Sequence, residues 1–236
     1  MNEIIQKALQ QGRDLLEPEA WHLLEEYGIN LPKWAFVEFS DSAEGAAANV
    51  GYPVVVKVVS ADIVHKSDVG GVVVNVKNPE ELLLAIETIQ NLVRVKVPEA
   101  RIEGWMITKM LCGDVEVIVG GFRDSQFGAT VMTGLGGVFV EIFRDISMGL
   151  APLEHGEALE MIQGLRAHRL LEGYRGKSAC DTSSLAQLIV KVGNLMVDFP
   201  CIQELDINPV LLTTDEALAV DVRIILDSAC SEDMAG

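Results

Sequence analysis

The chain changes character near Pro98, and this change is what most constrains its fold. Before Pro98, helical stretches alternate with short apolar runs. After it, WMITKM (105–110), EVIVGGF, ATVMTG and VFVEIF follow one another through glycine-rich turns. Short runs joined by glycine turns are typical of antiparallel hairpins. A helix–strand mixture followed by hairpins predicts an α+β fold with two lobes, over residues 1–104 and 105–226, with 227–236 as a frayed tail.

Local patterns predict the individual elements of both lobes. Helical spacing of apolar residues, with proline at helix starts and glycine at helix ends, indicates the helices. We expect helices over 3–11, 18–27, 42–50, 78–95, 154–165 and 182–199. We expect strands over 34–39, 54–59 and 72–77 in the first lobe, and over 201–224 at the end of the second.

Composition excludes several classes of protein. A formal net charge of −17 argues against non-specific nucleic-acid binding, which needs a basic surface. No apolar stretch approaches the roughly 20 residues of a membrane-spanning helix, and the N-terminus lacks the pattern of a signal peptide. The four cysteines are scattered without C-x-x-C spacing, which argues against a zinc site or a disulfide framework and favours the reducing cytoplasm.

A lysine interrupts five valines in VVVKVV (54–59). Alternation places Lys57 on the same face as Val55 and Val59, so both faces of the strand are apolar. A buried ammonium needs an anionic partner or a path to water. Lys57 is therefore either a side chain that reaches water at a sheet edge or a ligand for phosphate.

The loop VHKSDVGGV (64–72) follows this strand and carries a histidine. His65 lies next to Lys66 and shortly before Gly70 and Gly71, whose backbone N–H groups are able to approach an anion closely. A neutral imidazole is also a competent phosphoryl acceptor. His65 is either a surface histidine of a polar turn or a group that takes part in phosphoryl transfer.

A second unusual position is Glu116 in CGDVEVIVGG (112–121). Alternation places Glu116 beside Ile118 on one side of a strand, with Val115 and Val117 on the other. We expect a mid-strand position, and the pattern by itself is that of a half-solvated strand.

The stretch ELDINPV and its continuation predict a polar hairpin. Glu204, Asp206 and Asn208 alternate with apolar residues and share one face. If TTDE (213–216) is the turn, Asn208 lies directly opposite Asp221, and Asp206 opposite Arg223. Opposed side chains have Cβ atoms roughly 4.5–5.5 Å apart, so the pair is either a cross-strand polar contact or a clamp for Mg²⁺, which prefers hard oxygen ligands. A register slip of one residue would separate the two groups.

These residues and motifs together resemble an ATP-grasp protein with two α+β lobes enclosing a nucleotide site. GYPVVVKVVSADIVHKSDVGGV, EVIVGGFRDSQFG, GLGGVFVEIFRD, LLEGYRG and ELDINPV are similar, in this order, to the β subunit of ADP-forming acyl-CoA synthetases (acetate–CoA ligases), relatives of the succinyl-CoA synthetase β chain. The resemblance extends from about residue 10 to 226. It implies the reaction acyl-CoA + ADP + phosphate = carboxylate + CoA + ATP, by way of an acyl phosphate and a phosphohistidine on an α subunit.

The resemblance also implies roles for residues of this chain. Lys57, with the neighbouring Lys66, corresponds to contacts with nucleotide phosphates. The hinge whose backbone meets adenine corresponds to Thr108, Lys109, Met110 and Leu111, and the acidic residue near the ribose to Glu116.

Further matches concern the metal and the phosphoryl group. Asn208 and Asp221 correspond to the two Mg²⁺ ligands, and Asp206 to the acidic residue that steadies a phosphohistidine. His65 corresponds to a second phosphoryl carrier, which distinguishes the acyl-CoA synthetase branch from the succinyl-CoA synthetase β chain.

The chain carries no recognisable CoA-binding or acid-binding region, so the resemblance implies an α subunit that supplies both, in an α₂β₂ heterotetramer. Two alternatives remain open. One is a different ATP-grasp carboxylate ligase that passes an acyl phosphate to an amine. The other is a non-catalytic nucleotide-binding module that regulates a partner, against which the joint presence of the proposed lysine, glutamate and metal ligands speaks.

Overall fold

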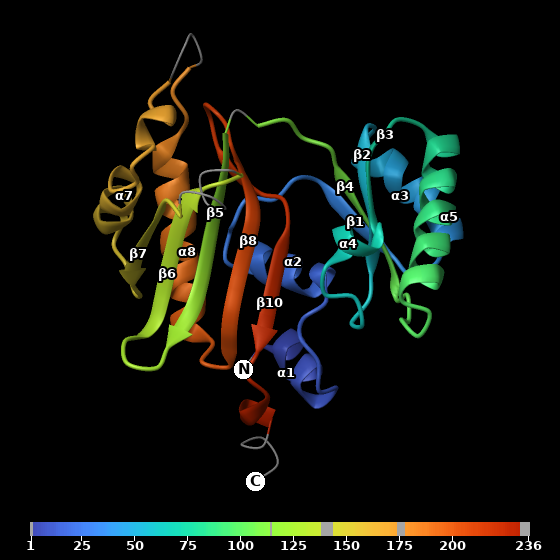
Figure 1. The fold of residues 1–236 in the computed structure, drawn as a ribbon, viewed down its shortest axis with the longest axis horizontal. Helices are drawn as coiled ribbons and strands as arrows, with labels where there is room; N and C mark the ends of the chain where they lie inside the picture. The colour runs from blue at the N-terminus through green and yellow to red at the C-terminus, as the bar shows by residue number, and fades with distance from the viewer. Residues whose placement is uncertain (1, 114, 138–143, 174–177, 232–236) are drawn as a thin grey trace. The chain divides into compact units, whose positions relative to one another are not determined.

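The computed structural model describes residues 2–113, 115–137, 144–173 and 178–231, which form two compact units. Residues 32–111 make up one unit, and residues 1–31 together with 112–236 make up the other. Each unit contains helices and one antiparallel sheet (Figure 1). The α+β fold class is therefore confirmed.

The unit of residues 32–111 contains a four-stranded sheet in the order β1-β4-β2-β3. One face of this sheet packs on its helices, where Val54, Val56 and Val58 join Leu82 and Ile89 in the core. The strands are β1 (Trp34–Val37), β2 (Val54–Val59), β3 (Val72–Val76) and β4 (Gly104–Lys109). The helices are η1 (Ser40–Ser42), α3 (Ala43–Val50), α4 (Lys66–Val69) and α5 (Pro79–Lys96).

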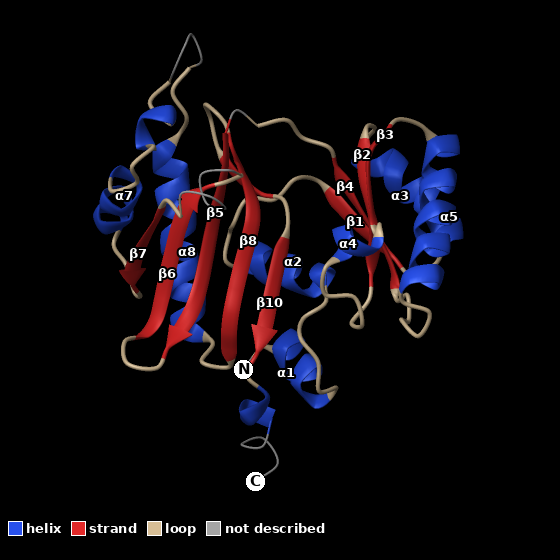
Figure 2. Ribbon diagram, viewed as in Figure 1, coloured by secondary structure: helices blue, strands red, loops and turns tan. Residues whose placement is uncertain are grey.

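The larger unit contains a six-stranded sheet in the order β10-β8-β5-β6-β7, with β9 also paired to β8. Its strands are β5 (Val115–Asp124), β6 (Gly128–Leu135), β7 (Ile146–Leu150), β8 (Ile202–Leu212), β9 (Ala217–Ala219) and β10 (Val222–Leu226). Helices α7 (His155–Gln163) and α8 (Thr182–Asp198) cover one face, as Figure 2 shows. A Cβ at Gly121 would lie 2.6 Å from Cγ of Met196 in α8, so this face of the sheet packs closely on the helix. Two short 3-10 helices, η2 (His168–Leu170) and η3 (Ser228–Ser231), complete the unit.

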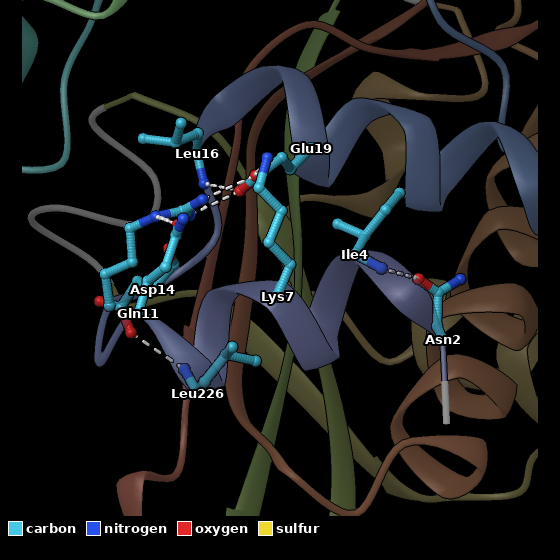
Figure 3. Close-up of polar contacts among 9 residues, drawn as sticks. Asn2, Ile4, Lys7, Gln11, Asp14, Leu16, Glu19 and Leu226 are labelled. Atoms are coloured by element: carbon cyan, nitrogen blue, oxygen red, sulfur yellow. Dashed lines mark hydrogen bonds and ion pairs between the residues drawn. The ribbon is translucent and has the colours of Figure 1, made fainter. Parts of the chain in front are cut away.

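The first 31 residues belong with the C-terminal sheet because polar contacts connect them to its last strand. Helices α1 (Glu3–Gln10) and α2 (Glu17–Glu26) flank a short segment, from which Arg13 binds Glu19 of α2 through two bonds of 2.6 and 2.7 Å. The carboxylate of Asp14 accepts the backbone N–H of Leu226 at 3.0 Å. Figure 3 shows the Asp14–Leu226 contact and, apart from it, Glu19 beside Leu16.

The predicted lobe boundaries differ from this arrangement in two ways. The sequence places residues 1–104 in one lobe, whereas residues 1–31 contact the other sheet. The run WMITKM, predicted to open the second lobe, is β4, which pairs with β1 and β2 in the first sheet. Strand pairing across the chain, which no local pattern specifies, decides both points.

Most predicted elements are present within a few residues of their expected bounds, and β2 has the expected bounds. The exceptions are β7, which was not predicted, and α4, where a loop was expected. The predicted tail begins with η3 rather than with frayed chain. The predicted strand VFVEIF (138–143) and part of LLEGYRG lie outside the described residues.

None of the helices in the described part of the chain is long and apolar enough to cross a membrane. The four cysteines, all of which lie in the described ranges, form no disulfide.

Candidate phosphoryl-transfer and metal site

The polar hairpin has the predicted register. Thr213 and Glu216 close the turn through a backbone bond of 3.0 Å, and Arg223 lies opposite Asp206. The backbone N–H of Asn208 donates to the carbonyl oxygen of Asp221 at 3.1 Å, so these two residues face each other across the hairpin. The expected pairing is confirmed.

The other side of β8 has an irregularity at the same place. Val117 of β5 pairs with Val210, but Val119 pairs with Ile207, so the register shifts between them. The extra residue falls at Asn208–Pro209. Bulges of this kind re-aim side chains and are common next to active sites. The side chain of Asn208, beside this bulge, is exposed.

Negative charge gathers on this face of the hairpin. The pKa of Asp206 is raised, first by burial of the carboxyl group and then by the nearby charges of Glu204 and Asp221, while Arg223 opposes the shift. A bound cation would relieve this repulsion. The oxygen donors of Asn208 and Asp221 are the hard ligands that Mg²⁺ prefers, so the residues present fit the ion.

The metal site would be an open one. No group of three or more His, Cys, Asp or Glu side chains in the described ranges is arranged to hold a metal ion. Two protein ligands on neighbouring strands would leave most positions of an octahedral ion for water and phosphate oxygens, which is the usual arrangement for Mg²⁺ at nucleotides.

Lys57 lies in the interior of its sheet. Its strand, β2, is flanked on one side by β3 and on the other by β4, where Lys57 pairs with Val72 and Met106. Only 5% of Lys57 is exposed. The interpretation of a lysine reaching water at a sheet edge is therefore wrong, and its role as a ligand for phosphate stays a prediction.

His65 is exposed and directly precedes the single-turn helix α4. The loop around it is anchored at both ends. The carboxylate of Asp62 accepts the backbone N–H of Arg101 at 2.8 Å, and the ammonium of Lys96 donates to the carbonyl oxygen of Asp68 at 2.8 Å. His65 is thus presented to solvent on an anchored segment.

The two glycines after α4 have a different role from the one predicted. The N–H of Gly70 donates to the carbonyl of Ser67 at 3.1 Å, and that of Gly71 to the carbonyl of Lys66 at 2.7 Å. Gly70 has φ +74°, the left-handed conformation of a helix C-cap. Both N–H groups are therefore engaged within the turn, and the prediction that they face an anion is wrong in this conformation.

The hinge segment Thr108–Leu111 begins with the last two residues of β4 and extends two residues beyond the strand. Thr108 is buried, and the Lys109 ammonium donates to the carbonyl oxygens of Gly51 and Tyr52 at 2.8 and 2.7 Å. The backbone N–H of Lys109 donates to Lys33, and that of Met110 to Pro53. The N–H groups of Lys109 and Met110 are therefore engaged within the unit.

Glu116 is exposed and is the second residue of β5, not a mid-strand residue as expected. It pairs with Leu211, and its carbonyl accepts the N–H of Gly136 at 2.8 Å.

Two charged residues in the recognised motifs are structural. The Arg123 guanidinium donates to the carbonyls of Met196, Phe199 and Ile202, which closes the C-terminal end of α8. The buried Asp145 carboxylate accepts the N–H groups of Arg166 and Ala167 at 2.8 and 2.9 Å. No local pattern distinguishes these contacts from those of a ligand site, because their partners lie far along the chain.

The candidate residues divide between the two units. The lysine of β2, the histidine loop and the hinge belong to the unit of residues 32–111, whereas the acidic hairpin and Glu116 belong to the larger unit.

Comparison with known proteins matches residues 7–226 to the ATP-grasp domain family. The acetate–CoA ligase (ADP-forming) I subunit beta of Pyrococcus furiosus is 47% identical over 224 residues, covering 95% of this chain and 97% of that protein. The acetate–CoA ligase (ADP-forming) I of Archaeoglobus fulgidus is 42% identical and covers 95% of this chain, which corresponds to 33% of that longer protein.

Solved structures agree with these matches. The dinucleotide-forming acetyl-coenzyme A synthetase 1 of Ca. Korarchaeum cryptofilum, in complex with coenzyme A, Ca-AMPCP and HgCl⁺, superposes with a TM-score of 0.91 at 41% identity, covering 94% of this chain and 97% of that one. A second structure of that protein, with Mg-AMPPCP and a phosphohistidine segment pointing towards the nucleotide-binding site, gives a TM-score of 0.84 at 38% identity, covering 95% and 99% of the two chains. The chain therefore belongs to the ATP-grasp family, among the β subunits of ADP-forming acetate–CoA ligases.

Proposed function

We propose that this chain is the nucleotide-binding β subunit of an ADP-forming acid–CoA ligase, which acts with an α subunit. The reaction is acyl-CoA + ADP + phosphate = carboxylate + CoA + ATP, and the chain passes the phosphoryl group between phosphohistidine and ADP. The hairpin register is the main support for the proposal, because it places Asn208 opposite Asp221. Asn208 lies on β8, the strand that also holds Asp206. The 47% identity to a β subunit, over 95% of this chain, supports the proposal.

Asn208 and Asp221 would hold Mg²⁺ through their oxygen atoms. When bound, the ion supplies positive charge at the phosphate oxygens. Asp206 accepts a hydrogen bond from the N–H of an incoming phosphohistidine ring. Its raised pKa makes it a better proton acceptor than an ordinary aspartate, and the bond orients the ring for in-line transfer.

Lys57 binds the nucleotide phosphates. Burial in an apolar strand strengthens the attraction between its ammonium and a phosphate, because the local dielectric is low. Lys66 adds a second positive charge next to His65. Carbonyl groups of Thr108–Leu111 contact adenine, and the exposed Glu116 accepts from a ribose hydroxyl.

His65 is the second phosphoryl carrier. In the direction of ATP synthesis, the P–N bond to the α-subunit histidine breaks as a P–N bond to a ring nitrogen of His65 forms. That bond then breaks as an oxygen of the ADP β-phosphate attacks phosphorus. The exposed position of His65 supports this role, since the ring has to meet both a donor and an acceptor.

The partner is an α subunit with the CoA-binding and phosphohistidine domains, in an α₂β₂ assembly. The β-subunit names of the relatives support the pairing. The scattered spacing of the four cysteines is compatible with the cytoplasm, which we propose as its compartment.

Labelled phosphoryl transfer tests the proposal. The α subunit is phosphorylated on its histidine with labelled phosphate and is mixed with this chain, either wild type or His65→Ala, with and without ADP. The wild-type chain becomes labelled on histidine and yields labelled ATP when ADP is present. The His65→Ala chain binds ADP with unchanged affinity but forms neither product. Undiminished ATP formation by His65→Ala would remove the relay role.

A further inference from the structure

Strand β7 forms one edge of the six-stranded sheet and exposes an apolar stripe. Ile146, Met148 and Leu150 point to the same face and are 37%, 55% and 53% exposed. The residues between them point to the other face, where a Cβ at Gly149 would lie 2.7 Å from Sδ of Met161 in α7. One face of β7 therefore packs on a helix, while the other presents three apolar side chains to solvent.

This stripe lies on the same face of the sheet as the acidic hairpin. Strand pairing aligns one row of residues across four strands, since Met148 pairs with Met132, Met132 with Gly120, and Gly120 with Asp206. Neighbouring strands are about 4.8 Å apart, so Met148 lies roughly 14 Å from Asp206 along the row. Gly120 adds no side chain to it. The apolar stripe and the proposed phosphohistidine ligand are thus two ends of one surface.

The composition of β7 is unusual for an exposed edge. Proteins protect edge strands with charged residues or proline, because an uncovered apolar edge associates with other chains. ISMGL has neither, in a chain whose net charge is −17. Contiguous apolar patches on soluble proteins mark interaction surfaces. Phe39 and Phe127 lie in loops, and the exposed Leu83, Leu84 and Val95 lie on α5 of the smaller unit.

We propose that the stripe Ile146/Met148/Leu150 is the docking surface for the α subunit, beside the segment that carries its phosphorylated histidine. Apolar side chains of the α subunit cover the stripe, and the histidine extends over Gly120 to Asp206. The inference rests on the proposed function. The shared row of paired residues identifies this occupant. A partner bound to β7 is close enough to Asp206 for one of its segments to reach that carboxylate.

The match lengths support the same occupant. Relatives of this chain occur as separate β subunits and also as chains of which it covers only 33% or 30%. In both arrangements the additional protein has to present its histidine to the same sheet. A second copy of this chain would cover the stripe without bringing the phosphorylated histidine of the α subunit to Asp206.

Met148→Glu tests the proposal, with Leu84→Glu on the exposed face of α5 as a control of equal charge change. The dissociation constant of purified α subunit for each chain is measured by calorimetry, and the rate of phosphoryl transfer from phosphorylated α subunit is measured beside it. Met148→Glu weakens association at least tenfold and slows transfer at subsaturating α subunit. ADP affinity and transfer at saturating α subunit stay unchanged, and Leu84→Glu matches wild type. Met148→Ala only removes apolar area, so it weakens binding of the α subunit less. It replaces Met148→Glu in the test if the glutamate variant is unstable.

Equal dissociation constants for Met148→Glu and Leu84→Glu would overturn the docking assignment while leaving the proposed function intact. A loss of self-association of the β chain, with unchanged binding of the α subunit, would assign the stripe to a second copy and also overturn it. Failure of the wild-type pair to transfer phosphate would instead remove the proposed function, and the inference with it.

Discussion

Gly71→Ala separates the packing role of the glycine pair from a role in binding anions. A Cβ at this position would lie 2.7 Å from Cγ1 of Val58 and 3.0 Å from the carbonyl oxygen of Lys66. Both neighbours are held, the first in the core of β2 and the second in the backbone of α4. Overpacking of this kind costs about 1–3 kcal/mol.

For a chain of this size, 1 kcal/mol corresponds to about 2–4 °C in Tm, so Gly71→Ala is expected to lower Tm by about 2–12 °C. The strain displaces α4, so labelling of His65 by the phosphorylated α subunit also falls. Gly45→Ala is the matched control, because a Cβ there, in the first turn of α3, meets nothing within 4 Å. That change stabilises the chain by about 0.5–1 kcal/mol.

Thermal unfolding and histidine labelling of the two variants check this reasoning. An unchanged Tm for Gly71→Ala, together with a loss of ADP or phosphate affinity, would mean that the glycine backbone binds the anion and that its role in packing is secondary.

Three further changes test the larger unit. Asp221→Ala raises the Mg²⁺ concentration needed for half-maximal ATP formation at least tenfold, whereas Asp215→Ala in the exposed turn of the same hairpin leaves it unchanged; equal requirements would refute the metal assignment. Asp206→Asn abolishes transfer but raises Tm at pH 7, because the raised pKa of Asp206 means that its ionisation opposes folding above the pKa of the unfolded chain. The gain in Tm shrinks as the pH falls through the folded pKa and vanishes below the ordinary value of about 4, and a gain independent of pH would contradict this cause. Arg123→Ala removes three carbonyl contacts at the end of α8 and costs about 2–3 kcal/mol in chemical denaturation, against less than about 0.5 kcal/mol for the exposed Arg94→Ala.

The hairpin shows how far local sequence determines a site. Strand residues alternate strictly between two faces, and TTDE leaves little freedom for the turn, so the opposition of Asn208 and Asp221 follows from residues within about 20 positions of each other. The bulge at Asn208–Pro209 does not follow in the same way. It arises where β8 pairs with β5, about 90 residues earlier, and depends on the fit between those two strands.

The boundaries of the units depend on contacts that are still more distant. Asp14 binds the backbone of Leu226, and no pattern near either residue indicates the other. β4 has the composition of any apolar strand, and only its pairing with β1 and β2 assigns it to the smaller unit.

The glycine pair illustrates a second limit of local patterns. A left-handed helix cap and a phosphate-binding turn both require glycine, so Gly70 and Gly71 fit either role by composition. The packing of α4 on Leu92 and Val58 decides between them. β7 was not predicted because ISMGL is only five residues long. One face of it packs on α7, a contact that the local sequence does not indicate.

ATP formation from separately purified subunits tests whether this chain passes the phosphoryl group to ADP. Acetyl-CoA, ADP, Mg²⁺ and labelled phosphate are supplied to the α subunit alone, to this chain alone and to the mixture, and labelled ATP is measured. We expect labelled ATP only from the mixture, and none when the chain carries Asp206→Asn. Labelled ATP from the α subunit alone would show that this chain is not needed for the transfer. A mixture that forms none, while this chain binds both ADP and the α subunit, would refute the proposed transfer.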